Sequence, residues 1–187
     1  MLKEIINETT DAVVTAVKGV DDILGAVTGT VKNQVVNVLK GTGEVSTAGI
    51  DMVASVASGA IQGAGQVGAS LTEVIYSTMS GVVNGANEVG GDVISAIRGG
   101  AKGIVQTTAE TGGDVGAAAV SAVEGSIKAA GNIGADTAEA AKAAVGGAMD
   151  AAASVGGDTG QKVRDALLSA ATLPRDVIES ALKGSDK

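Results

Sequence analysis

Three glycines and a column of aspartates are the residues whose types and spacing could do chemistry in this chain. Gly63, Gly65 and Gly68 form the pattern G-x-G-x-x-G, which in dinucleotide-binding proteins lets the backbone approach a pyrophosphate. That function requires a strand before the glycines and a helix after them. Here the pattern lies inside a helical repeat, described below, so we expect no cofactor.

The aspartates Asp92, Asp114, Asp136 and Asp158 recur every 22 residues. Carboxylates can hold a metal ion, but on one continuous helix neighbours in this column would be about 33 Å apart. Each aspartate also follows a pair of small residues that includes glycine, a place where Asp commonly caps the start of a helix. The column therefore favours helix caps, and we expect no metal site.

The composition excludes several classes of function. The chain has neither Cys nor His, which excludes thiol and imidazole catalysis and disulfides. No Ser, Asp or Lys set forms a recognisable nucleophile–base pair, so we predict that the protein is not an enzyme. The 13 Lys+Arg face 21 Asp+Glu, the net charge is −8, and Tyr76 is the only aromatic residue. Nucleic-acid binding needs basic clusters and stacking rings, so we expect no nucleic-acid partner.

The chain shows no clear targeting segment. Glu4, Glu8 and Asp11 interrupt the apolar residues of the N-terminus, so no signal-peptide core forms. The longest uncharged run, Met52 to Thr72, is long enough to span a bilayer but is rich in Gly, Ala, Ser and Gln. We expect a cytoplasmic protein, with association to a membrane surface as the open alternative.

An internal repeat organises most of the chain. Blocks of 22 residues that start at Gly59, Gly81, Gly103, Gly125 and Gly147 align without gaps, and two earlier units start at Asn37 and Thr15. We therefore divide the chain into an N-terminal amphipathic helix start (1–14), a repeat region (15–171) and a C-terminal cap or docking helix (172–187).

Two columns of the repeat predict helix packing. The third position of each unit is a large apolar residue: Val17, Leu39, Ile61, Val83, Val105, Ile127 and Met149. The fifth position is small, with Thr107 as its largest member: Gly19, Gly41, Gly63, Gly85, Thr107, Ala129 and Ala151. We expect the first column to form the apolar packing face and the second to let two helices approach closely.

The apolar spacing predicts an all-α protein. Within one unit, Val83, Ala86, Val89, Val93 and Ile97 follow one another at steps of three or four, which is the spacing of one face of an α-helix. The unit of 22 residues is two elevens, and eleven residues make three helical turns. Because this spacing continues through the glycine pairs, we favour long, continuous or gently broken helices. The alternative is a series of helices of about 18 residues that reverse at each glycine pair, as in an up-and-down array or a solenoid.

The glycines need a compensating interaction. A glycine inside a helix costs roughly 0.5–1 kcal/mol relative to alanine, and the chain has 29 glycines. Small residues four apart allow helices to pack closely, and a lone amphipathic rod cannot bury its own apolar face. We therefore expect a homo-oligomeric bundle or coiled-coil-like assembly in which the protein's partner is itself.

The C-terminal segment is set apart from the repeat. Thr172-Leu173-Pro174 interrupts the helical pattern, since Pro suits the first turn of a helix but not its interior. The residues from Arg175 to Lys183 then form a short amphipathic pattern. We expect this helix to cap the repeat array or to dock on a larger protein complex.

The repeat resembles those of two groups of helical proteins. Its period is similar to the eleven-residue amphipathic repeats of lipid-droplet coat proteins, exchangeable apolipoproteins and late-embryogenesis-abundant proteins, although this chain is only 18% charged. Its glycine- and alanine-rich style resembles the helical stalk subunit of high-affinity nickel–iron hydrogenases. That likeness implies a self-associating scaffold or stalk with an apolar interior face that encloses a lipophilic molecule or tethers to a membrane. The alternative is an amphipathic protein that binds lipid surfaces reversibly.

Overall fold

The computed structural model describes residues 1–18, 22–42 and 47–185. These residues form helices and no strands, which confirms the all-α class. The helices of the described chain are α1 (Leu2–Val17), α2 (Ile23–Thr42), α3 (Thr47–Gln66), α4 (Leu71–Glu88), α5 (Val93–Glu110), α6 (Val115–Asn132), α7 (Thr137–Val155), α8 (Thr159–Ser169) and α9 (Arg175–Ser185).

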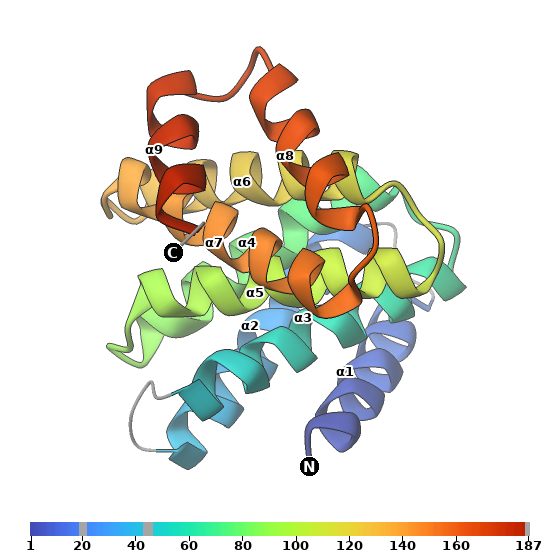
Figure 1. Cartoon of the computed structure of the whole chain (residues 1–187). Coiled ribbons are helices and arrows are strands. Elements are labelled where there is room, and N and C mark those ends of the chain that lie inside the picture. The colour runs from blue at the N-terminus through green and yellow to red at the C-terminus, as the bar shows by residue number, and fades with distance from the viewer. Residues whose placement is uncertain (19–21, 43–46, 186–187) are drawn as a thin grey trace.

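The helices form two layers that follow the chain order. The most extensive contacts join helices two apart: α1 with α3, α3 with α5 and α5 with α7 in one layer, and α2 with α4 and α4 with α6 in the other. Consecutive helices also touch, which joins the layers. Figure 1 shows the result as a stack that rises from α1 at the bottom to α8 and α9 at the top. The helices from α4 to α7 begin 22 residues apart, at Leu71, Val93, Val115 and Thr137, and each 22-residue block of the sequence therefore runs from the middle of one helix to the middle of the next.

Glycines in the left-handed conformation end four of the helices. Gly68, Gly90, Gly112 and Gly134 have φ between 66° and 74°, which L side chains rarely adopt. The residue after each glycine donates a backbone hydrogen bond to the carbonyl five residues earlier, for example from Gly113 N–H to the Thr108 carbonyl at 2.8 Å. This is the Schellman closure of a helix.

The expectation of long continuous helices is therefore wrong, and the alternative with reversals at the glycine pairs is the arrangement found. The spacing was misleading because apolar residues on the two sides of a linker can stay in phase, as they do between α4 and α5. Val89 directly follows α4 and Val93 begins α5, and both are half-buried against the same core. An apolar pattern can thus continue through a turn that reverses the chain.

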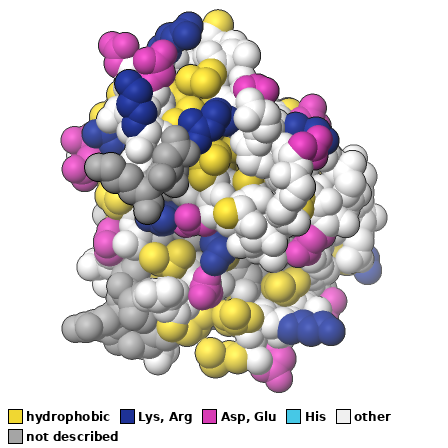
Figure 2. All heavy atoms as spheres, in the orientation of Figure 1, with side chains coloured by type: hydrophobic (Ala, Val, Ile, Leu, Met, Phe, Trp, Pro, Cys, Tyr) yellow, Lys and Arg dark blue, Asp and Glu magenta, His cyan; other side chains and the backbone are white. Residues whose placement is uncertain are grey.

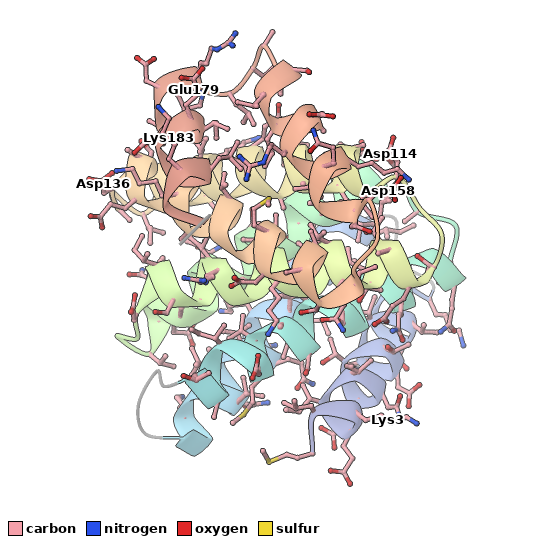
Figure 3. All side chains as sticks on the ribbon, in the orientation of Figure 1. Lys3, Asp114, Asp136, Asp158, Glu179 and Lys183 are labelled. Atoms are coloured by element: carbon pink, nitrogen blue, oxygen red, sulfur yellow. The ribbon has the colours of Figure 1, made fainter. Side chains whose placement is uncertain are left out.

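The aspartate column caps helices, as expected, at three of its four positions. Asp92 accepts a hydrogen bond from the Ser95 backbone N–H, Asp114 from Ala117, and Asp136 from Ala138 and Glu139. Asp158 makes no such bond and instead pairs with Lys162 at 3.1 Å. In Figure 3, Asp114 and Asp158 lie on the right side of the stack and Asp136 lies on the left side, as the reversal of each helix requires.

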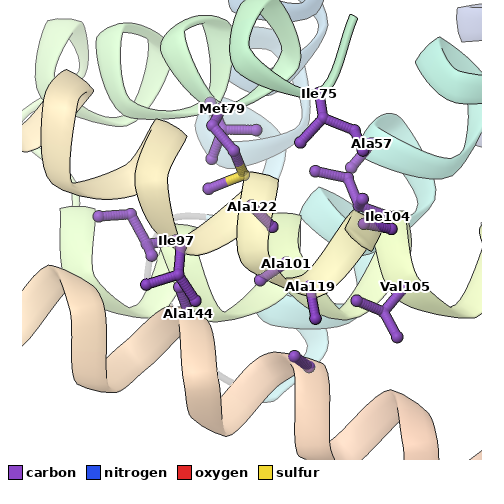
Figure 4. Packing of buried hydrophobic residues seen from close by; sticks show 14 of the residues in the cluster. Ala57, Ile75, Met79, Ile97, Ala101, Ile104, Val105, Ala119, Ala122 and Ala144 are labelled. Atoms are coloured by element: carbon purple, nitrogen blue, oxygen red, sulfur yellow. The ribbon is translucent and has the colours of Figure 1, made fainter. Parts of the chain in front are cut away.

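The core consists mainly of small side chains. One apolar cluster runs through the described helices and is built largely from Ala and Val. Its largest fully buried members include Ile75, Met79, Ile97 and Ile104. Figure 4 shows them interleaved with alanines of neighbouring helices. Small side chains allow the helix axes to lie close together, so the packing depends on backbone proximity as well as on apolar area.

Both ends of the stack carry polar outer faces. At the first end, the exposed positions of α1 include Lys3, Glu4, Glu8 and Asp11. At the other end, α8 and α9 are shorter helices that pack on α6 and α7. The C-terminal helix α9 buries Ile178 and Leu182 and begins directly after Pro174. Polar terminal units of this kind close a repeat array.

Candidate functional site

The contacts between helices two apart form a repeated structure that we call the seams. In the seams that join α1 to α3, α2 to α4, α3 to α5, α4 to α6 and α5 to α7, glycines of the later helix receive side chains or backbone of the earlier helix. A Cβ added at Gly63 would lie 2.9 Å from the Val13 Cβ, and one at Gly85 would lie 2.9 Å from the Val35 Cβ. These two glycine–valine pairs are separated by the same 50 residues, as the arithmetic 63 − 13 and 85 − 35 shows. The seams therefore repeat with the sequence.

The seams are tightest between α3 and α5 and between α5 and α7. A Cβ at Gly103 would lie 2.8 Å from the carbonyl carbon of Ala54, and closer still to its oxygen. A Cβ at Gly147 would lie 3.0 Å from the carbonyl carbon of Arg98, with that oxygen again nearer. Here backbone meets backbone, and no side chain could turn away to make room. Only glycine fits at these positions without a shift of a helix.

Hydroxyl groups tie the backbones together across three seams. The hydroxyl of Thr10 shares its hydrogen between the carbonyl of Ile6 in its own helix at 2.8 Å and that of Gly59 across the seam at 3.2 Å. The hydroxyl of Thr28 is likewise shared between Leu24 at 3.0 Å and Ser77 at 3.3 Å. Ser58 donates across the seam to the carbonyl of Gly103 at 3.2 Å. Such bonds fit only where the helices nearly touch.

The large apolar column lies mostly in the interior. Val17, Leu39, Ile61, Val83 and Val105 are buried. Ile127 and Met149 are half-buried and pack against the same core. The column is thus covered by other helices of the same chain.

The small column is divided. Gly63 and Gly85 lie in seams, and Ala129 and Ala151 are buried. Gly41 lies on the surface, and a Cβ there would meet nothing within 4 Å, so its expected role in close approach is wrong. Gly41 lies near the end of α2, and α2 is the first helix of its layer. No earlier helix of that layer therefore packs on α2 in the way that α2 packs on α4. Gly19 lies outside the described residues.

Ion pairs also join helices two apart, and sequence reasoning missed them. Lys32 pairs with Glu88 at 2.8 Å, Lys102 with Asp51 at 2.7 Å, and Arg98 with Asp150 at 2.8 Å. The hydrogen bond from Lys32 lowers the pKa of Glu88. A search for opposite charges 51 to 56 residues apart, between two and three units of the repeat, could have found these pairs.

Tyr76 has a role beyond the packing that an isolated aromatic residue suggests. Its hydroxyl donates to Glu124 of α6, and the hydroxyl of Thr172 donates to the other oxygen of the same carboxylate. The hydrogen bond to Glu124 raises the pKa of Tyr76 to about 12, with burial adding to the shift. Glu124 thus connects α4 and α6 to the linker before α9.

The two chemical candidates of the sequence are both used for the fold. In the G-x-G-x-x-G pattern, Gly63 lies in a seam and Gly68 ends α3 in the left-handed conformation. Within the described residues, no three or more Asp or Glu gather as they would around a metal ion. No helix of the described chain is sufficiently long and apolar to cross a membrane.

On the face drawn in Figure 2, acidic, basic and hydrophobic side chains are interspersed among other side chains and backbone. Comparison with known proteins found no protein-family model and no curated protein that matches this chain.

Proposed function

We propose that this protein is a non-enzymatic helical scaffold: a rigid stack of helices that holds its outer surface in a defined geometry for partners. The observation that carries the proposal is the use of the repeat. The regular spacing of the sequence brings Gly63 against Val13 and Gly85 against Val35, two equivalent contacts in two neighbouring seams. Regular contacts of this kind give the stack a defined shape, because each unit packs on its neighbour in the same way.

Cross-links on the outside of the stack support a rigid rather than a loosely packed array. The Asp51–Lys102 pair spans the seam between α3 and α5, and the Arg98–Asp150 pair spans the next seam, between α5 and α7. Partly exposed pairs contribute little stability each. They fix the relative register of helices that glycine seams would otherwise allow to slide.

Self-association stays a prediction. We expected self-association because a single helical rod would leave its apolar face exposed. In the stack, other helices of the same chain cover the large apolar column. The scaffold therefore does not need an oligomer in order to fold. Further copies, or a larger complex, would bind through the outer surface.

The lipid-binding alternative requires a different use of the same residues. A helix that lies on a membrane must direct its Val and Ile face outward, whereas Val83 and Val105 are fully buried between helices. Lipid binding would require the stack to open and lose its seams. The buried column therefore favours the scaffold.

Light scattering combined with small-angle X-ray scattering tests the proposal. We expect a compact particle whose mass is 17.9 kDa or a multiple of it, with helix content that does not depend on protein concentration. Flotation with phosphatidylcholine–phosphatidylglycerol vesicles should leave the protein unbound and its helix content unchanged.

A matched pair of variants sharpens this test. Ile61→Asp places a charge in the buried column and should unfold the stack, whereas Gln62→Asp, at a partly exposed neighbour, should not. Flotation of the parent with a large gain in helicity on lipid would instead show that the lipid-bound form is the folded one.

A further inference from the structure

A cavity of about 440 Å³ opens on the side of the stack where α6 and α8 begin. The end of α5, the linker after it, the end of α7 and the first turn of α8 all contribute to its wall. The apolar side chains of the lining belong to Ala109, Val115 and Val155, and the polar ones to Asp114, Thr159 and Lys162. An apolar wall with a few convergent polar groups is typical of a small-molecule site.

Thr159 gives this lining a hydroxyl group without a partner. The residue is 8% exposed, and its Oγ1 makes no hydrogen bond with the described residues. Unlike the unbonded hydroxyls of Thr9, Thr78 and Thr107, this one is not cut off from solvent. Because Thr159 lines the cavity, its hydroxyl is reached from there. An acceptor on a ligand would supply the hydrogen-bond partner that the fold does not.

Val155 is an apolar side chain that the fold leaves uncovered beside this hydroxyl. It is 43% exposed. Val67, Val89 and Ile133, which hold the same position in other units of the repeat, are half-buried. Val155 lines the cavity together with Val115. An alkyl group in the cavity would remove this apolar surface from water, which is favourable.

Asp114 supplies the negative charge of the lining. Its Oδ1 accepts from the Ala117 N–H at 3.0 Å and caps α6, which leaves Oδ2 for a ligand. A Cβ added at Gly116 would lie 3.4 Å from both the Asp114 Oδ1 and the Lys162 carbonyl oxygen. The acidic residue and the basic residue of the lining therefore come from neighbouring points of α6 and α8.

Lys162 supplies the positive charge. Its ammonium group has three N–H donors and pairs at 3.1 Å with Asp158, which does not line the cavity. Figure 3 shows Asp158 on the same side of the stack as Asp114. Both side chains of the Lys162–Asp158 pair are largely exposed, so the pair contributes little and a ligand can compete for the ammonium group.

The lining thus carries one negative and one positive charge, which sum to zero. A ligand that is only an anion would meet the carboxylate of Asp114, and one that is only a cation would meet the ammonium group of Lys162. A zwitterion with an alkyl group matches all three parts of the cavity.

We propose that this cavity binds a free aliphatic α-amino acid. The ligand carboxylate accepts from Lys162 and from the Thr159 hydroxyl, its ammonium group donates to Asp114, and its side chain covers Val155. The positive end of the α8 dipole also favours the carboxylate. The site is independent of the scaffold function, since the cavity lies at helix ends and outside the seams.

Isothermal titration with L-leucine at neutral pH tests the proposal, with 3-methylbutylamine and 4-methylpentanoate as comparison ligands. The amine is leucine without its carboxylate, and 4-methylpentanoate is leucine without its ammonium group. We expect saturable binding of one leucine per chain. Each comparison ligand should bind at least about tenfold more weakly, because it leaves one charged group of the lining without a partner.

Three variants each remove one contact. Thr159→Val keeps the side-chain shape and should weaken leucine binding about five- to tenfold, the loss expected for one hydrogen bond. Lys162→Met and Asp114→Asn should each weaken it about tenfold or more, because each removes a charged partner. Asn retains the ability to cap α6.

The start of α7 supplies matched controls. Asp136 caps α7 as Asp114 caps α6, and Thr137 begins α7 as Thr159 begins α8. Neither control residue lines the cavity. Asp136→Asn, Thr137→Val and Lys142→Met should bind leucine as the parent does, and circular dichroism should show that all six variants are folded.

Leucine binding that never saturates, or equal binding of either comparison ligand, would overturn the proposal. An unchanged affinity in Thr159→Val or Lys162→Met would do the same, because the ligand would then not contact α8. An equal loss in Asp114→Asn and Asp136→Asn would also overturn it, since leucine would then respond only to the overall charge of the protein.

Discussion

The closest approach of α3 and α5 can be tested by adding one methyl group. Gly103→Ala places a Cβ 2.8 Å from the Ala54 carbonyl carbon, where ordinary contact begins at 3.4 Å. The two helices must separate by about 0.6 Å along that line (3.4 − 2.8), and by more to clear the oxygen. Gly29→Ala is the matched control, since Gly29 also lies inside a helix and a Cβ there meets nothing within 4 Å.

The expected magnitude is the balance of two effects. Both variants gain about 0.5–1 kcal/mol from the higher helix propensity of alanine. Gly29→Ala should show this gain alone. Gly103→Ala should also suffer an overpacking cost of about 1–3 kcal/mol, so it should be less stable than the parent by about 1–2 kcal/mol. Because the propensity gain is common to both, the difference between the variants reports the seam.

Urea denaturation followed by circular dichroism measures both free energies of unfolding. In thermal melts, each kcal/mol should move the midpoint by about 2–4 °C for a chain of this length. A Gly103→Ala variant as stable as Gly29→Ala would refute the argument, because it would mean that the backbones of α3 and α5 do not meet at Ala54.

Three further predictions concern helix ends and the Tyr76 contact. Gly112→Ala should lower stability by about 1–2 kcal/mol, because Gly112 has a φ of +74° although a Cβ there would meet no other atom; an unchanged unfolding curve would contradict the left-handed helix end. The hydrogen bond from Ser95 lowers the pKa of Asp92, so this carboxylate stabilises the fold at neutral pH, and its contribution of about 1 kcal/mol should be lost as the pH falls below about 4. Asp92→Ala should remove that contribution, and an acid unfolding profile identical to the parent's would argue against the cap. Tyr76→Phe should cost about 1 kcal/mol; because the pKa of Tyr76 is raised to about 12, the parent alone should lose this stability between about pH 10 and 12, which urea titrations at alkaline pH would measure.

Several elements of the fold could be predicted from the sequence because their causes are local. The helical class follows from the three- and four-residue apolar spacing, and the caps at Asp92, Asp114 and Asp136 follow from an Asp after a pair of small residues. The interruption before α9 follows from Pro174. Each of these depends on residues within about one helical turn.

The direction of the chain after each glycine pair could not be derived in this way. The apolar phase of Val89, Val93 and Ile97 fits a continuous helix as well as a reversal. The chain reverses because α5 gains packing energy when it lies against α3, where Gly103 contacts Ala54. That gain is a long-range contact, which a local pattern does not contain.

The residues of the seams were likewise predictable only in part. Sequence reasoning selected Gly63 and Gly85 as places of close approach, and both lie in seams. It also selected Gly41, which lies in the same column but on the open face of α2. The contact of Tyr76 with Glu124 had no sequence signal, since it depends on a carboxylate supplied by another helix.

The sequence by itself determined the units: their length, their helical character, their caps, and the alternation of large and small residues that makes a tight seam possible. Only the tertiary structure decided which helix fills each seam, which positions of a column stay open at the end of the stack, and where a cavity is left between helices. The physical reason is the separation along the sequence of the residues that interact. Backbone conformation and capping are set by neighbours along the chain, whereas the backbone contact at Gly103 and the cavity lined by Asp114 and Lys162 exist only once segments about 50 residues apart lie against each other.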